Sequence, residues 1–144
     1  MHSQSNRRTA RRMAGTAAVE FSLVFPLLLL VVFGVIEFGT ALYDKSVVTN
    51  ASREAARAGV VLHTPSLTSG QIQTVASNYC TNKLVTYGKA SNCSFPGTIT
   101  PCSGSGNQLT VQVAYTFNGL VLGPMIAPFT GPLTINATTT MLCE

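Results

Sequence analysis

The stretch FSLVFPLLLLVVFGVI, from Phe21 to Ile36, decides the fold, because Ser22 is the one mildly polar residue within it. Extended to Tyr43, the segment is long enough to cross a bilayer, which takes about 20 helical residues for a core of about 30 Å. A single span must be helical, since lipid offers its backbone polar groups no partner. The sequence therefore predicts a transmembrane helix over residues 16–43, bent near its start by Pro26.

Residues 1–15 form a polar leader with four arginines and no acid. The remaining residues carry equal numbers of basic and acidic side chains, so the net charge of +4 belongs to the leader. A nucleic-acid-binding domain needs a basic face on its folded body, and none is available here. Positive charge before a span places the N-terminus in the cytoplasm, which predicts that the chain beyond Tyr43 is exported.

A secretory signal peptide shares this layout and is the simpler competitor. Its apolar region covers about 7–15 residues and ends at a small-x-small cleavage site. Here the apolar run is longer and leads into Glu37 and Phe38 without such a site. The sequence therefore favours a retained span over a signal peptide.

Two acids flank the apolar run, Glu20 before it and Glu37 after it. An acid inside the bilayer costs roughly 2.5–3.5 kcal/mol on insertion scales, so it normally has a partner or a role. Glu20 taken alone would be explained by the first helical turn, where the helix dipole favours an acid by about 0.3–1 kcal/mol. For Glu37 two interpretations stay open: it snorkels to the outer headgroups, or it contacts another subunit or a machinery helix.

The junction Gly15-Thr16-Ala-Ala-Val-Glu20-Phe21 resembles the cleavage and methylation site of type IV pilin precursors. In that family a prepilin peptidase cuts after the glycine that ends a basic leader, and a glutamate followed by an aromatic residue occupies the fifth mature position. The resemblance implies cleavage between Gly15 and Thr16. It also implies that Glu20 meets the N-terminal amine of a neighbouring subunit and sets its axial register, because opposite charges in a low-dielectric setting must find each other.

Four ordered segments resemble the TadE-like family, which comprises minor pilins or pseudopilins of the tight-adherence (Tad or Flp) pilus machinery. They are AVEF, FPLLL, GVIEFG and NASREAARAG, within residues 10–60. The resemblance implies a structural protein of the bacterial inner membrane, whose C-terminal domain is periplasmic or extracellular. Its implied partners are the prepilin peptidase, other pilins or pseudopilins and Tad assembly proteins. An uncleaved, single-span exported domain that acts as a receptor or scaffold is the alternative.

The helix is predicted to continue outside the membrane as an amphipathic extension over residues 44–60. No helix breaker separates Tyr43 from Gly59, which can end the helix. Apolar side chains recur at three- and four-residue steps and form a stripe. The stripe consists of Val47, Val48, Ala51, Ala55, Ala58 and Leu62.

Residues 61–144 are predicted to form an exported α+β head with a pilin-like plan. The pattern predicts a helix over residues 69–87, a loop with a short strand near residues 98–100, a strand over 109–117 and a last strand over 133–143. Between the two long strands, residues 118–132 are apolar but interrupted by prolines and glycines. We expect them to form a crossover that packs on the sheet or touches the membrane face.

All four cysteines lie in the exported part, which favours two disulfides in an oxidising compartment. They are Cys80, Cys93, Cys102 and Cys143, and three pairings are open. Zinc is disfavoured because there is no CxxC spacing and His63 is the one exported histidine. No paired carboxylates, phosphate-binding loop or catalytic triad can be assembled. The sequence therefore predicts no enzyme, no cofactor, no metal and no small-molecule substrate.

Overall fold

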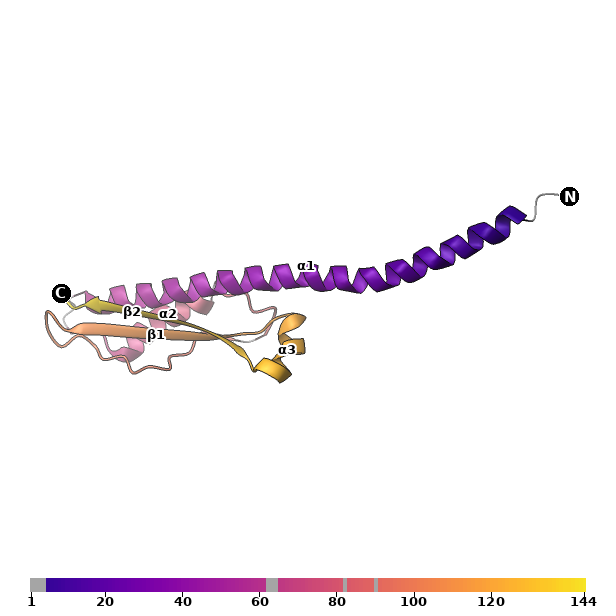
Figure 1. Ribbon diagram of the computed structural model, residues 1–144. Helices are drawn as coiled ribbons and strands as arrows, with labels where there is room; N and C mark the ends of the chain where they lie inside the picture. The colour runs from indigo at the N-terminus through magenta and orange to yellow at the C-terminus, as the bar shows by residue number, and fades with distance from the viewer. Residues whose placement is uncertain (1–4, 62–64, 82, 90) are drawn as a thin grey trace. The chain divides into compact units, whose positions relative to one another are not determined.

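The computed structural model describes residues 5–61, 65–81, 83–89 and 91–144, with the side chains of residues 5–14, Leu122, Ile126 and Thr130 excepted. The chain divides into two compact units, Met1–Ile36 and Glu37–Glu144. Along the sequence a long helix is followed by a short helix, a strand, a second short helix and a strand (Figure 1). This order confirms the predicted α+β class.

Helix α1, Ser5–Val60, contains the predicted span and the predicted amphipathic extension. It begins earlier than expected, within the leader, and it includes Pro26. By length and composition it is the one described helix that could cross a membrane. In the first unit the large apolar side chains from Val19 to Ile36, Phe33 excepted, are exposed, as a lipid-facing or subunit-facing helix requires.

In the second unit, one face of α1 holds the head. Its buried members recur at steps of seven, four, three and four residues, which keeps them on one side of a 3.6-residue helix. The series is Glu37, Asp44, Val48, Ala51 and Ala55, and Val47, Ser52, Ala56 and Val60 beside it are buried as well. The small alanines allow the sheet to come close, and a Cβ at Gly59 would lie 2.5 Å from Leu109 Cδ2. Gly59 therefore serves close packing as well as lying next to the helix end.

Strands β1, Gln108–Phe117, and β2, Leu133–Leu142, form a two-stranded antiparallel sheet. The register pairs Gln108 with Leu142 and Phe117 with Leu133. Alternate residues of β1 enter the core, as the sequence pattern predicted, and four of them are fully buried: Leu109, Val111, Val113 and Tyr115. Ser52 of α1 shares a hydrogen bond of 2.7 Å with Thr139 of β2.

Helix α2, Ser69–Thr81, begins with a capping box. The Thr68 N–H donates to Gln71 Oε1 at 2.9 Å, and the Gln71 N–H donates to Thr68 Oγ1 at 3.4 Å. The prediction that this helix extends to Tyr87 was wrong. The chain turns after Cys80, and Tyr87 has a φ of 48°, in the left-handed region that a helix cannot include.

The expectation of a short strand near residues 98–100 was also wrong. No strand forms there, and β1 makes an isolated bridge through Ala114 to Ser94. The predicted crossover between the strands contains a helix that the sequence analysis did not predict, α3, Leu122–Thr130. Pro124 lies in its first turn, where its missing N–H has no helical partner to lose.

Two disulfides tie the loops of the head to its regular elements. Cys80 of α2 bonds to Cys93, and Cys102 bonds to Cys143 just after β2. The expectation of two disulfides is confirmed, and the pairing is one that the sequence had left open. The two disulfides add stability that the small hydrophobic core of a head of this size cannot supply alone.

Candidate functional site

The residues of the predicted processing junction all lie on α1 with exposed side chains. Gly15 and Thr16 are followed one turn later by Glu20 and Phe21 on the same helix. The Phe21 ring stacks on Phe25 with 5.2 Å between the ring centroids. Nothing in the described part of the chain covers this segment, so its side chains face whatever surrounds the helix.

Glu37 has hydrogen-bond partners within its own chain. Its side chain is 5% exposed. One carboxylate oxygen accepts the backbone N–H of Val121, and the other accepts the N–H of Gly123 at 3.1 Å. Glu37 thus binds the first turn of α3.

This arrangement suits a carboxylate for two reasons. The first N–H groups of a helix have no partner within the helix, and the aligned peptide dipoles place partial positive charge there. Gly119 also permits the close approach, because a Cβ at this position would lie 2.5 Å from Glu37 Oε2 and 2.8 Å from the Gly123 nitrogen. The glycine turn and the acid therefore work as one unit, which we call the Glu37 clasp: Glu37, Gly119, Val121 and Gly123.

Two more polar contacts follow along the same face of α1. Thr40 shares a hydrogen bond of 2.8 Å with the Tyr87 hydroxyl. One turn further on, Asp44 Oδ1 accepts the Val85 N–H at 2.9 Å. These bonds attach the irregular segment after α2 to the face of α1.

Asp44 is fully buried, and its second oxygen has no hydrogen-bond partner among the described residues. Burial raises the pKa of this carboxyl above its ordinary value of 3.8, and the Val85 N–H partly offsets the rise. Burial, together with the nearby Asp44 charge, likewise raises the pKa of the Tyr115 phenol. Asp44 and Tyr115 are thus two buried titratable groups that interact inside the head.

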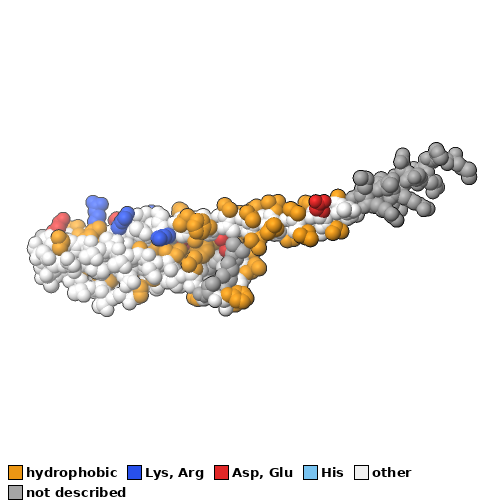
Figure 2. All heavy atoms as spheres, in the orientation of Figure 1, with side chains coloured by type: hydrophobic (Ala, Val, Ile, Leu, Met, Phe, Trp, Pro, Cys, Tyr) orange, Lys and Arg blue, Asp and Glu red, His pale blue; other side chains and the backbone are white. Residues whose placement is uncertain are grey.

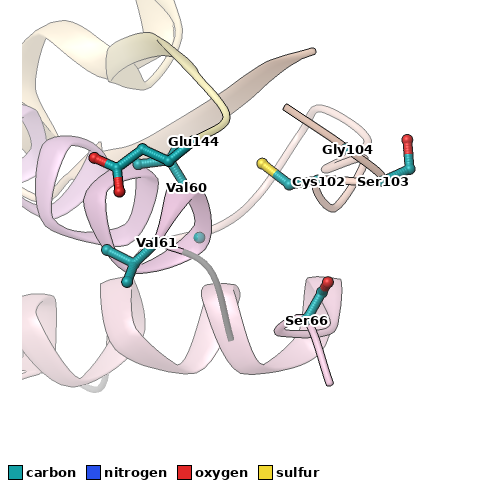
Figure 3. A pocket seen from close by; sticks show the side chains of 8 residues that line it. Val60, Val61, Ser66, Cys102, Ser103, Gly104 and Glu144 are labelled. Atoms are coloured by element: carbon teal, nitrogen blue, oxygen red, sulfur yellow. The ribbon is translucent and has the colours of Figure 1, made fainter. Parts of the chain in front are cut away.

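The described residues assemble no catalytic site. They contain no cluster of three His, Cys, Asp or Glu side chains that could hold a metal. A hollow of about 130 Å³ lies at the other end of the head (Figure 3). It is lined by the end of α1, Ser66, the loop from Cys102 to Gly104, and Glu144. Among the described residues that line this hollow, Glu144 is the one with a carboxylate side chain, and none is a histidine, lysine or arginine.

Sequence reasoning found Glu37 but missed the groups that bind it. Gly119, Val121 and Gly123 act through backbone atoms or through the lack of a side chain, which residue type alone does not reveal. One signal was available: a proline near the start and a glycine just past the end mark a helix. Pro124 and Gly131 have these places in α3, and the Gly131 N–H donates to the Ala127 carbonyl at 2.9 Å.

Comparison with known families places the N-terminal part of the chain. Residues 15–57 match the model of the TadE-like protein family. This part of the chain is a TadE-like family domain, which confirms the resemblance seen in the sequence. The matched segment includes the junction, Glu20, Glu37 and most of the face of α1 that holds the head. No curated protein and no solved structure matches the chain.

Proposed function

We propose that this chain is a minor pilin or pseudopilin of a Tad (Flp) pilus that contributes structurally to pilus assembly and adherence. The TadE-like domain at residues 15–57 carries the proposal, because that family implies a Tad pilus-associated protein. The family is one of pilus components not known to be enzymatic, which agrees with the lack of catalytic chemistry in the described residues.

The first step of the proposed function is processing at the junction. A prepilin peptidase removes residues 1–15 by cutting between Gly15 and Thr16. Support comes from the exposure of both residues and from the open space at Gly15, where a Cβ would meet nothing within 4 Å. Cleavage removes the four leader arginines and creates a new amine on Thr16.

The second step is lateral assembly in the inner membrane. The new amine on Thr16 and the Glu20 carboxylate are four residues apart on one helical face. Each charge is costly in lipid, so the Glu20 carboxylate of one copy pairs with the amine of its neighbour and sets the axial register. Other pilins or pseudopilins and the Tad assembly proteins are the proposed neighbours.

The third element is the head, which is carried outside the membrane. The polar contacts of Glu37, Thr40 and Asp44 and the apolar stripe beyond them bind it along α1. The head therefore follows the helix when subunits stack, and it presents its outer surface to the other components of the pilus.

Intact mass spectrometry of the membrane-bound protein tests the proposal. We expect the mass of residues 16–144 in cells that contain the prepilin peptidase and the mass of the whole chain in cells that lack it. Gly15→Val should block cleavage, whereas Gly39→Val, at an equally open glycine of the same helix, should not. A whole chain in peptidase-containing cells would support the uncleaved receptor or scaffold instead.

A further inference from the structure

The crossover between the two strands exposes a group of large apolar side chains, which we call the α3 surface. Its members and their exposed fractions are Leu120 at 54%, Met125 at 60%, Phe129 at 89% and Leu133 at 57%. Residues 118–133 contain no Asp, Glu, Lys or Arg. We propose that the α3 surface lies in the outer leaflet of the membrane, so that the head contacts lipid beside the transmembrane helix.

The composition of α3 is the first reason. A helix that is apolar on all sides is normally buried in a protein core or in a membrane. The large described side chains of α3, Met125 and Phe129, are not buried in the core of this chain. Phe129 is the more exposed of the two, at 89%. Exposed apolar groups that lie together mark a surface that something else covers.

The Glu37 clasp supplies the second reason, because it sets the depth of α3. The uninterrupted apolar run from Phe21 to Ile36 is shorter than the roughly 20 residues that a bilayer core requires. The predicted span, residues 16–43, continues past Ile36 through the next turns of α1, so Glu37 lies inside it. Since the Glu37 carboxylate accepts N–H groups of Val121 and Gly123, the start of α3 lies at the same depth.

The third reason is continuity with lipid-facing residues in the same unit. Phe38, Leu42 and Tyr43 follow Glu37 on α1 and are 67%, 53% and 49% exposed. Tyrosine is typical of the membrane interface, where its ring stays apolar and its hydroxyl reaches water. In Figure 2 hydrophobic side chains gather on this part of α1 and on the crossover that carries α3. We therefore expect the lipid that surrounds this part of α1 to reach the α3 surface as well.

The absence of tryptophan from the sequence permits a direct test. Phe129→Trp introduces a single fluorophore on the α3 surface, at a side chain exposed enough to accept the larger ring. The full chain is reconstituted in phosphatidylcholine vesicles at high dilution, and quenching is measured with brominated acyl chains and with aqueous acrylamide. Phe38→Trp serves as the lipid-facing control and Ser105→Trp, in the exposed turn before β1, as the water-facing control. Met125→Trp repeats the measurement on a second α3 residue.

We expect Phe129→Trp to behave like Phe38→Trp, with strong quenching by brominated lipid and several-fold weaker quenching by acrylamide than Ser105→Trp shows. Quenching by acrylamide as strong as that of Ser105→Trp would overturn the proposal. Protection from both quenchers would also overturn it, because protein would then cover the surface. The proposal rests on the transmembrane span, and Phe38→Trp tests the span separately: if it escapes the brominated lipid, the proposed membrane function fails as well.

Discussion

Glu37 shows how an acid in a predicted apolar span can be stabilised by hydrogen-bond donors. Its charge is unfavourable in lipid unless donors surround it, and no Lys or Arg lies between Arg12 and Lys45 on this helix. The backbone N–H groups of Val121 and Gly123 supply the donors without a second charge. Glu37 therefore attaches the crossover of the head to the helix.

Glu37→Ala should destabilise the head, because it leaves the partly buried N–H groups of Val121 and Gly123 without their acceptor. The expected loss in the free energy of unfolding is roughly 1–3 kcal/mol. Thermal unfolding in detergent, followed by the near-ultraviolet circular dichroism of the tyrosines, measures the head without the signal of the long helix. Glu20→Ala removes the same charge from an exposed position and should leave this transition unchanged. Equal transitions in the two variants would contradict the clasp.

Asp44, which lies beyond the predicted span of residues 16–43, predicts a specific pH dependence of the head. Because burial raises its pKa in the folded state above the ordinary 3.8, the folded protein binds this proton more tightly than the unfolded chain does. Its contribution to stability is therefore complete below 3.8 and is lost as the pH rises through the folded-state pKa.

Asp44→Asn should remove this dependence while Oδ1 continues to accept the Val85 N–H. We expect the variant to match or exceed the wild type in thermal stability near pH 7 and to lose that advantage near about pH 4. Unfolding of both proteins across this range gives the difference directly. Glu54→Gln, a neutralised and exposed acid on the same helix, is the control. A wild-type-to-variant difference that does not change with pH would contradict the burial of a charged Asp44.

At the scale of elements, α3 exists because three local conditions meet. Its first turn tolerates Pro124, a glycine with a φ of 76° follows its last residue, and an acid from another helix binds its N-terminal N–H groups. Gly119 joins these conditions, since only a residue without a Cβ lets β1 turn into α3 against the Glu37 carboxylate.

Gly119→Ala should therefore be destabilising, by about 1–3 kcal/mol, as an overpacked site is. Its Cβ would lie 2.8 Å from backbone atoms of Gly123, which cannot move aside as a flexible side chain can. Gly123→Ala is the matched control, because its Cβ would have ordinary space and alanine favours a helix. Both are measured by the same unfolding transition. A Gly119→Ala protein as stable as Gly123→Ala would show that the turn does not require glycine.

At the scale of the whole molecule, the parts of α1 before and after Glu37 differ in what their side chains contact. The large apolar side chains from Val19 to Ile36, Phe33 excepted, are exposed and remain available to lipid and to neighbouring subunits. From Glu37 onward one face of α1 is committed to the head. The TadE-like match, residues 15–57, spans both parts, whereas most of the head lies beyond it.

Glu20→Ala tests the register contact at this scale. The variant should be cut after Gly15 as the wild type is, because the junction itself is unchanged, but its recovery in sheared pili should fall severalfold. Immunoblots of sheared pili and of membranes, with intact mass for processing, measure both steps. Glu54→Ala, an exposed acid on the same helix outside the span, should assemble normally. Normal recovery of Glu20→Ala would remove the proposed pairing with the neighbouring amine.

Much of this architecture follows from sequence alone, because it depends on local patterns. The apolar run from Phe21 to Ile36 dictates a helix, the alternation within β1 and β2 dictates strands, and four cysteines in a small exported head favour disulfides. The family resemblance of the first part likewise rests on short ordered segments. These features depend on residues that are close together in the sequence, so they can be predicted from the sequence alone.

Other features were decided by contacts between residues far apart in the chain. The position of the segment after α2 depends on Asp44 and Thr40, which bind Val85 and Tyr87 from another helix. The formation of α3 depends on Glu37 in the same way. Backbone N–H groups occur in nearly every residue, so residue type does not reveal which of them bind Glu37. The need for a glycine becomes visible only when a neighbouring residue occupies the space that a Cβ would fill. The tertiary structure therefore determined the role of Glu37, the disulfide pairing and the position of the α3 surface.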